Sequence, residues 1–176
     1  MLPILETERL RLRAFTADDI GEVTPLIGAR EVAATTLRIP HPYSEEHFRH
    51  FLDHMQSESS PTLAITLRDG GQVIGGIGFR LEMDHQRAEL GYWLGVPYWG
   101  HGYATEAARE MLRYGFEELK LHRIFAEYFE HNPASGRVLA KIGMQHEGCR
   151  REHTLKWERF VTAEQYGILR QEWESR

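Results

Sequence analysis

Residues 97–107 read P-Y-W-G-H-G-Y-A-T-E-A, and this stretch decides the fold because it separates two kinds of periodicity. Before it, Ala88–Val96 alternates between two faces as a β-strand does. After it, apolar residues recur at helical spacing from Ala104 to Leu119. The sequence therefore predicts a strand, a glycine-containing turn and the N-terminus of a helix.

This turn predicts an anion site. The first N–H groups of a helix have no partner within the helix, and Gly100 and Gly102 let the backbone approach a ligand closely. Such a turn binds phosphate through main-chain amides, or is an ordinary strand-to-helix connection. A Walker loop is excluded because no Gly-Lys-Ser/Thr occurs, and a Rossmann loop is disfavoured because the third glycine is missing.

Outward from this unit, the patterning predicts strands and helices along the whole chain. The predicted elements are strand 9–15, a helix after Thr16, a helix from Ser44, a hairpin over 62–81, strand 88–96, helix 104–119, strand 122–129, a helix from Pro133 to Gly143, and strands near 144–153 and 165–173. The strand–helix–strand unit over 88–129 implies a right-handed crossover and a parallel strand pair.

Composition limits the classes of protein. The chain has 176 residues, 41% hydrophobic and 27% charged, as expected for one domain spanning 1–176. Its net charge of −5 disfavours nucleic-acid binding. No apolar run is long enough for a bilayer and no secretion signal is present, so we expect no membrane partner and a cytoplasmic location. The single cysteine, Cys149, fits a reducing compartment.

Several ordered motifs together resemble the GNAT N-acetyltransferases. They are the turn with its helix, H-R-I-F-A-E-Y-F-E-H-N-P-A-S-G-R-V-L-A-K-I-G-M from His122, and the C-terminal W-E-R-F and Y-G-I-L-R-Q-E-W. The nearest branch is the RimJ/RimL-like group, named for enzymes that acetylate ribosomal-protein N-termini. Trp99 departs from the superfamily loop, which carries Gln or Arg there, and is interpreted as a mark of this branch.

The resemblance implies a fold of the α/β (α+β) class. In that fold a mixed, largely antiparallel sheet of about seven strands is flanked by about four helices, with a central splay between two parallel strands. It also implies transfer of an acetyl group from acetyl-CoA, as co-substrate, to a primary amine.

The same resemblance implies a set of cofactor-binding residues. They are Trp93, Leu94, Gly95 and Val96 along the strand, Gly100, His101, Gly102, Tyr103, Ala104 and Thr105 in the turn, and Asn132, Ser135, Arg137 and Lys141 near the following helix. For Asn132 and Ser135 the alternative role is helix capping. For Arg137 and Lys141 the alternative is a solvated helix face.

Three residues are candidates for proton transfer. Glu89 is the favoured base, acting through water, because alternation places this acid within an apolar strand; an ion pair with Arg80 or Arg87 is the alternative. Ser135 is expected to hydrogen-bond the leaving thiolate. Tyr128 is a second candidate acid, or an aromatic wall.

Several alternatives stay open. The same fold could bind acyl-CoA as a sensor, without turnover. His47, His50 and His54 share a helix face, but no carboxylate completes a ligand set, so no metal is expected. The acceptor is a protein N-terminus, such as that of a ribosomal protein, or a small-molecule amine. We expect a monomer or a homodimer.

Overall fold

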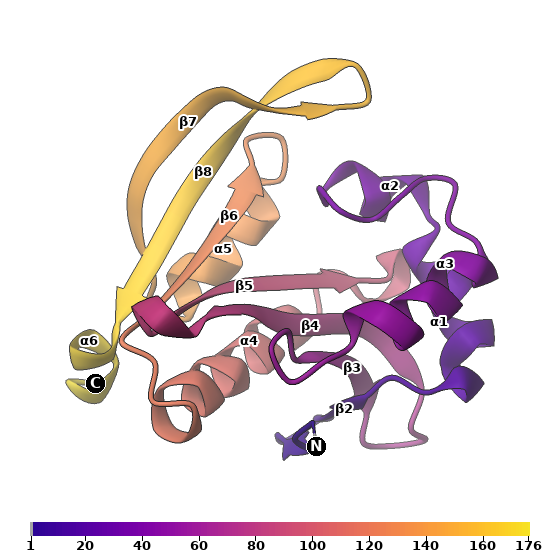
Figure 1. Cartoon of the computed structure of the whole chain (residues 1–176), viewed down its shortest axis with the longest axis horizontal. Coiled ribbons are helices and arrows are strands. Elements are labelled where there is room, and N and C mark those ends of the chain that lie inside the picture. The colour runs from indigo at the N-terminus through magenta and orange to yellow at the C-terminus, as the bar shows by residue number, and fades with distance from the viewer. Residues whose placement is uncertain (1) are drawn as a thin grey trace.

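The computed structural model describes residues 2–176, which form one mixed sheet with helices on both faces (Figure 1). The sheet has eight strands in the order β1-β2-β3-β4-β5-β6-β8-β7. Their bounds are β1 Leu5–Glu6, β2 Leu10–Ala14, β3 Thr62–Leu67, β4 Val73–Glu82, β5 Arg87–Leu94, β6 Arg123–Phe129, β7 Gln145–Lys156 and β8 Arg159–Leu169. Only β5 and β6 pair in parallel among these strands, so the predicted parallel pair and the largely antiparallel sheet are confirmed.

The helices are those predicted, with two short additions. They are α1 Ile20–Ile27, α2 Arg30–Ala34, α3 Glu45–His50, α4 Tyr103–Arg113, α5 Pro133–Lys141 and α6 Arg170–Glu174; α3 and α4 continue as π-helical turns over Phe51–Met55 and Tyr114–Glu118. Short 3-10 turns cover Ala17–Asp19, Met83–His85 and Val96–Tyr98. No helix among residues 2–176 combines the length and the apolar character that crossing a membrane requires.

Two hydrophobic cores hold the helices on opposite faces of the sheet. On one face, α4 contributes Met111 and Leu112 and α5 contributes Leu139 to a core with the sheet residues. On the other face, α1 and α3 bury Val23 and Phe48 against the sheet. Burial of such side chains stabilises each by about 1.5–3 kcal/mol, so the packing fixes α4 and α5 behind the strands that they follow.

The parallel pair is short, and this shapes the centre of the molecule. β5 and β6 pair only from Arg87↔Arg123 to Glu89↔Phe125, although β5 continues to Leu94. Beyond Glu89 the strands separate, and β6, β7 and β8 rise away from β5 in Figure 1. The splay predicted between two parallel strands is therefore confirmed.

Three details of the sequence prediction were wrong. The last strand is β8 at Arg159–Leu169, not 165–173, and Trp173 lies in α6. The alternating pattern hid the helix start, where Glu172 accepts a hydrogen bond from the Leu169 amide at 2.8 Å. The structure also adds β1, which is only two residues long, and α2 before the proline-broken linker.

A buried ion pair joins β2 to the first helical turn. Arg13 donates two hydrogen bonds to the Asp19 carboxylate, at 2.8 and 2.7 Å, and the Thr16 amide donates a third at 2.8 Å. Burial opposes ionisation of Asp19, but these donors outweigh it and hold its pKa below the ordinary value. The pair therefore fixes the entry to α1.

We predict that Asp19→Asn lowers the free energy of unfolding by about 2 kcal/mol at pH 7, because it leaves Arg13 without its charge partner. Since the folded-state pKa is depressed, this contribution is complete above the unfolded pKa near 3.9 and is lost as pH falls through the folded value. Urea unfolding at pH 7 and below pH 4 measures both effects. Asp18→Asn, at an exposed neighbour, should change stability by less than about 0.5 kcal/mol. Equal losses in the two variants would contradict the prediction.

Candidate active site

The turn after β5 has the geometry of an anion site. Gly100 and Gly102 have φ of +81° and +83°, a left-handed region that other residues occupy at a cost. Gly102 is the N-cap of α4, and no side chain of the described residues caps this end. The first amides of an 11-residue helix are thus left for a ligand at its positive end.

The N-terminal strand region holds this turn in place. Glu106, in the first turn of α4, accepts hydrogen bonds from Thr7 Oγ1 at 2.6 Å and from the Arg9 amide and Nε at 2.8 and 2.7 Å. Burial of Glu106 opposes its charge, but these donors outweigh it and keep its pKa below the ordinary value. Arg9 also donates to the His101 carbonyl at 3.1 Å and lies 4.7 Å over the Tyr103 ring.

Trp99 has a structural role in the same turn. Its indole Nε1 donates to the Leu94 carbonyl at 2.8 Å, which ties the turn to the last residue of β5. The residue that departs from the superfamily loop therefore stabilises the turn through an internal hydrogen bond.

A cavity of about 570 Å³ opens where β5 and β6 separate. It lies between the splayed strands, the α1–α3 layer and the linker after α2, and aromatic rings form much of its wall. Five of the predicted site residues line it: Glu89, Trp93, Tyr128, Asn132 and Ser135. The structure thus brings the three candidate catalytic residues to one cavity.

Tyr92 is a site residue that the sequence analysis missed. Its hydroxyl lies 2.7 Å from Ser135 Oγ, and burial raises the pKa of Tyr92 to about 12. The phenol therefore keeps its proton and can donate to Ser135, whose own hydroxyl proton is then free to point into the cavity. Alternation along the strand places Tyr92 on the opposite face from Glu89, but the local pattern does not indicate that this face meets α5.

Glu89 has two cationic partners. Arg80 donates to its Oε2 from Nε at 3.0 Å and from Nη2 at 2.5 Å, and Arg38 donates to the same oxygen at 3.1 Å. Arg87, the other partner considered, pairs with Glu82 instead. Within the described residues, Glu89 Oε1 has no hydrogen-bond partner, so it is the oxygen available to a ligand or water.

Asn132 and Tyr128 flank Ser135. Asn132 directly precedes α5, and its side chain caps no amide among the described residues, so its amide group is available to the cavity. The Tyr128 hydroxyl packs against α5 at Gly136, where an added Cβ would lie 2.5 Å away. Burial, and then the neighbouring Tyr166 and Glu164, raise the pKa of Tyr128, so this phenol also stays protonated.

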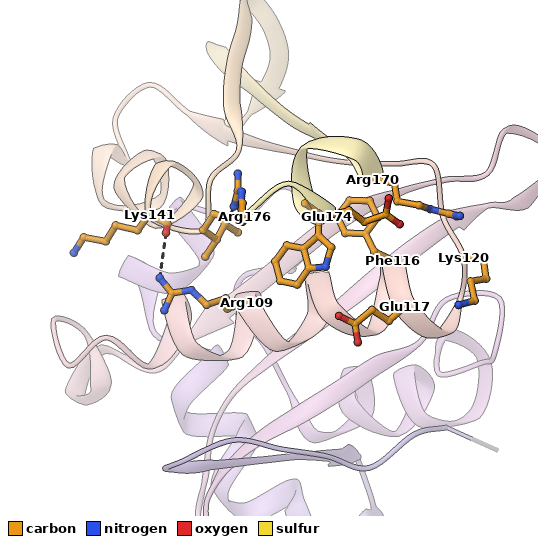
Figure 2. Close-up of a pocket in the computed structure, with 10 residues that line it drawn as sticks. Arg109, Phe116, Glu117, Lys120, Lys141, Arg170, Glu174 and Arg176 are labelled. Carbon is orange, nitrogen blue, oxygen red and sulfur yellow. Dashed lines mark hydrogen bonds between the residues drawn. The ribbon is translucent and has the colours of Figure 1, made fainter.

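Only three of the fourteen predicted cofactor residues line this cavity; the others lie at the end of β5 and just after it, in the turn, and on α5. Arg137 is exposed on α5. Lys141 ends that helix, and its carbonyl accepts from Arg109 at 3.2 Å in a different cleft (Figure 2). Among the predicted histidines, His47 Nδ1 lies 2.9 Å from Ser44 Oγ. No group of three or more potential metal ligands occurs within residues 2–176.

The splayed sheet, the glycine turn and the adjoining cavity define the class of the protein, an N-acetyltransferase. The sequence matches the acetyltransferase (GNAT) domain family over residues 9–145, and the chain belongs to this family.

Known relatives agree with this assignment. The uncharacterized N-acetyltransferase YoaA of Bacillus subtilis is 36% identical over 163 residues, 87% of this chain and 89% of that protein. The crystal structure of a GNAT-family acetyltransferase from Bacillus anthracis superposes with a TM-score of 0.87 at 29% identity, over 96% of this chain and 99% of that one. The [ribosomal protein uS5]-alanine N-acetyltransferase of Escherichia coli is 38% identical over 66 residues, 38% of this chain and 34% of that protein.

We predict that Arg9→Ala loosens the turn, because it removes the guanidinium bonds to Glu106 and to the His101 carbonyl together and leaves only the main-chain amide bond to Glu106. The amides of residues 100–104 should exchange with deuterium about tenfold faster, while stability falls by only about 1 kcal/mol because Arg9 is half exposed. Arg11→Ala is the matched control, since this arginine makes only an exposed pair with Glu6 at 3.7 Å. The same exchange rates in both variants would show that Arg9 does not hold the turn.

Proposed function

We propose that residues 1–176 form one GNAT domain that transfers an acetyl group from acetyl-CoA to a primary amine. The observation that supports this most directly is the separation of β5 from β6, which opens the cavity lined by Ser135 and Tyr92 beside the strand that leads into the turn before α4. When bound, acetyl-CoA supplies the activated acyl thioester. Residues of the chain bind the thioester, orient the amine and transfer the protons.

The residues present fit acetyl-CoA. From Leu90 to Leu94 the β5 edge that faces β6 has no strand partner, so its main-chain groups can pair with an extended amide chain. The predicted strand positions Trp93 to Val96 and turn positions Gly100 to Thr105 follow one another along this path. Asn132 Nδ2 and Oδ1 can bond the same amide chain from the α5 side. Arg137 remains a proposed phosphate contact.

We assign proton handling to three side chains. Tyr92 donates to Ser135 Oγ, and Ser135 in turn donates its hydroxyl proton toward the departing sulfur. Glu89 accepts a proton from the attacking amine through a water at Oε1, the oxygen that the two arginines leave free. The Leu94 amide stabilises charge on the thioester oxygen, because the Gly95 amide already donates to the Ile74 carbonyl at 2.9 Å.

An α-amine is the acceptor that the site favours chemically. At pH 7, deprotonating an α-amine with a pKa near 7.8 requires about 1.1 kcal/mol, whereas lysine near 10.4 requires about 4.6 kcal/mol. We therefore propose a protein N-terminus as acceptor, in the manner of the RimJ/RimL-like branch, and the likeness to the E. coli uS5-alanine enzyme supports a ribosomal protein.

The test of function is CoA release from acetyl-CoA with three acceptors: peptides with a free N-terminus, the same peptides blocked there but containing lysine, and small amines. We expect turnover to be highest with free N-termini. Gly102→Val should raise the KM for acetyl-CoA about tenfold or more, because the φ of +83° at this position strains a β-branched residue and so displaces the turn. Gly70→Val is the control, with a similar φ of +93° in a distant turn. If the protein bound CoA but turned over no acceptor, the sensor function would be favoured and the proposed acetyltransferase function would be rejected.

We predict that Ser135→Ala lowers kcat about tenfold and Tyr92→Phe about three- to tenfold, with little change in the KM for acetyl-CoA. Ser135→Ala removes the hydrogen bond proposed to reach the leaving group, and Tyr92→Phe removes the one that orients Ser135. Each is worth about 1 kcal/mol, and neither is proposed to bind the cofactor. Steady-state kinetics on both single variants and the double variant measure this. The double variant should be no slower than Ser135→Ala, because Tyr92 acts through Ser135. An additive loss would contradict the relay.

A further inference from the structure

A second cleft, of about 710 Å³, lies at the far end of α4 from the glycine turn (Figure 2). It is formed where the π-helical turn after α4, the C-terminal end of α5 and α6 meet. Five cationic side chains line it: Arg109, Lys120, Lys141, Arg170 and Arg176. Only two carboxylates do so, Glu117 and Glu174. The cleft is thus positive in a chain whose net charge is −5.

The positive charge of this cleft is not compensated. Within residues 2–176, none of its five cations forms an ion pair with a carboxylate, whereas arginines elsewhere, such as Arg13 and Arg123, are paired. Three arginines of the cleft donate to main-chain carbonyls instead. Arg109 bonds Lys141 at 3.2 Å, Arg170 bonds Leu121 at 2.7 Å, and Arg176 bonds Ile142 at 2.7 Å.

These carbonyl bonds orient the guanidiniums without neutralising them. For Arg109 and Arg176 they also satisfy the last carbonyls of α5, which is an ordinary helix-capping role. The two lysines have no such role, because the ammonium groups of Lys120 and Lys141 have no hydrogen-bond partner among the described residues. Figure 2 shows these lysines at opposite ends of the cleft, with Glu174 between them.

An aromatic pair forms part of the cleft between these ends. The rings of Phe116 and Trp173 are stacked with centroids 5.9 Å apart. Phe116 is buried, while Trp173 is half-buried and lines the cleft. Fixed cations beside an aromatic surface provide both charge and stacking for one ligand. The volume is in the range of about 300–1,000 Å³ typical of small-molecule sites.

We propose that this cleft binds a small organic anion that carries phosphate groups on a flat ring, as a nucleotide does. Guanidinium forks and ammonium groups suit phosphate oxygens, and the ring would contact Trp173. A long polyanion is disfavoured by the two carboxylates in the cleft and by the negative net charge of the chain. Phe116 is about 20 Å along the helix from Tyr103, at 1.5 Å per residue, so this site is separate from the turn.

The proposal is tested with ATP in magnesium-free buffer and with inorganic pyrophosphate, by isothermal calorimetry and by tryptophan fluorescence. We expect ATP to bind in the micromolar range and more tightly than pyrophosphate, and to quench fluorescence. Trp173→Phe should remove the quenching. The double variant Arg109→Gln/Lys120→Gln should weaken ATP binding at least tenfold. Arg151→Gln/Arg159→Gln removes the same charge from exposed positions on β7 and β8 and should leave it unchanged.

The following outcomes would overturn the proposal. ATP bound at the glycine turn would be insensitive to Arg109→Gln/Lys120→Gln and displaced by CoA, and either result would overturn the proposal. If both double variants weakened ATP binding equally, the effect would come from the overall charge of the protein and not from this cleft, and the proposal would be overturned. The proposal would also be overturned if calorimetry showed no heat of binding at millimolar ATP, or if ATP bound no more tightly than pyrophosphate. Thermal unfolding of each variant excludes loss of the fold as the cause.

Discussion

The structure depends on one constraint: two parallel strands pair for three residues and then separate. A sheet normally satisfies its main-chain donors and acceptors with a neighbouring strand, and exposing them without a partner is unfavourable. Here β5 continues for five residues past Glu89 with one edge unpaired. The same divergence makes room for the aromatic cavity, which the start of α5 also lines. In the proposed function, the cofactor path, the acceptor space and the hydroxyls of Tyr92 and Ser135 all depend on this single interruption of the ladder.

The separation persists because packing and polar contacts support both of its sides. On the β5 side, the Trp99 indole bonds the last strand carbonyl and the Arg9–Glu106 contact braces the helix that follows. On the β6 side, Gly136 lets the Tyr128 ring lie directly against α5. Tyr92 bridges the two sides through Ser135. These contacts depend on a few particular side chains, whereas the core beneath them is formed by many aliphatic and aromatic side chains.

Much of this architecture could be predicted from the sequence, for reasons that are physical. Period-two and period-3.6 patterns are strong in 88–96 and 104–119, and the crossover rule then dictates the parallel pair. What escaped prediction depends on contacts between distant residues. The Arg9–Glu106 bond joins residues 97 apart, and Arg38 reaches Glu89 across 51. The Tyr92–Ser135 hydrogen bond spans 43, and local patterning carries no record of such distances. The end of β8 was misread because the helix that follows it is only five residues long.

The brace from the first strand to the turn has a consequence for how the molecule assembles. Loop-closure entropy must be overcome before residues so far apart in sequence can meet, whereas β4, β5 and the crossover to β6 involve neighbours in the chain. The sheet centre and its helix can thus form early, with the turn still fluctuating. Its amides become rigid only when β2 docks alongside β3. We therefore expect order in the turn to be acquired last, and local unfolding of the N-terminal strand to release it first.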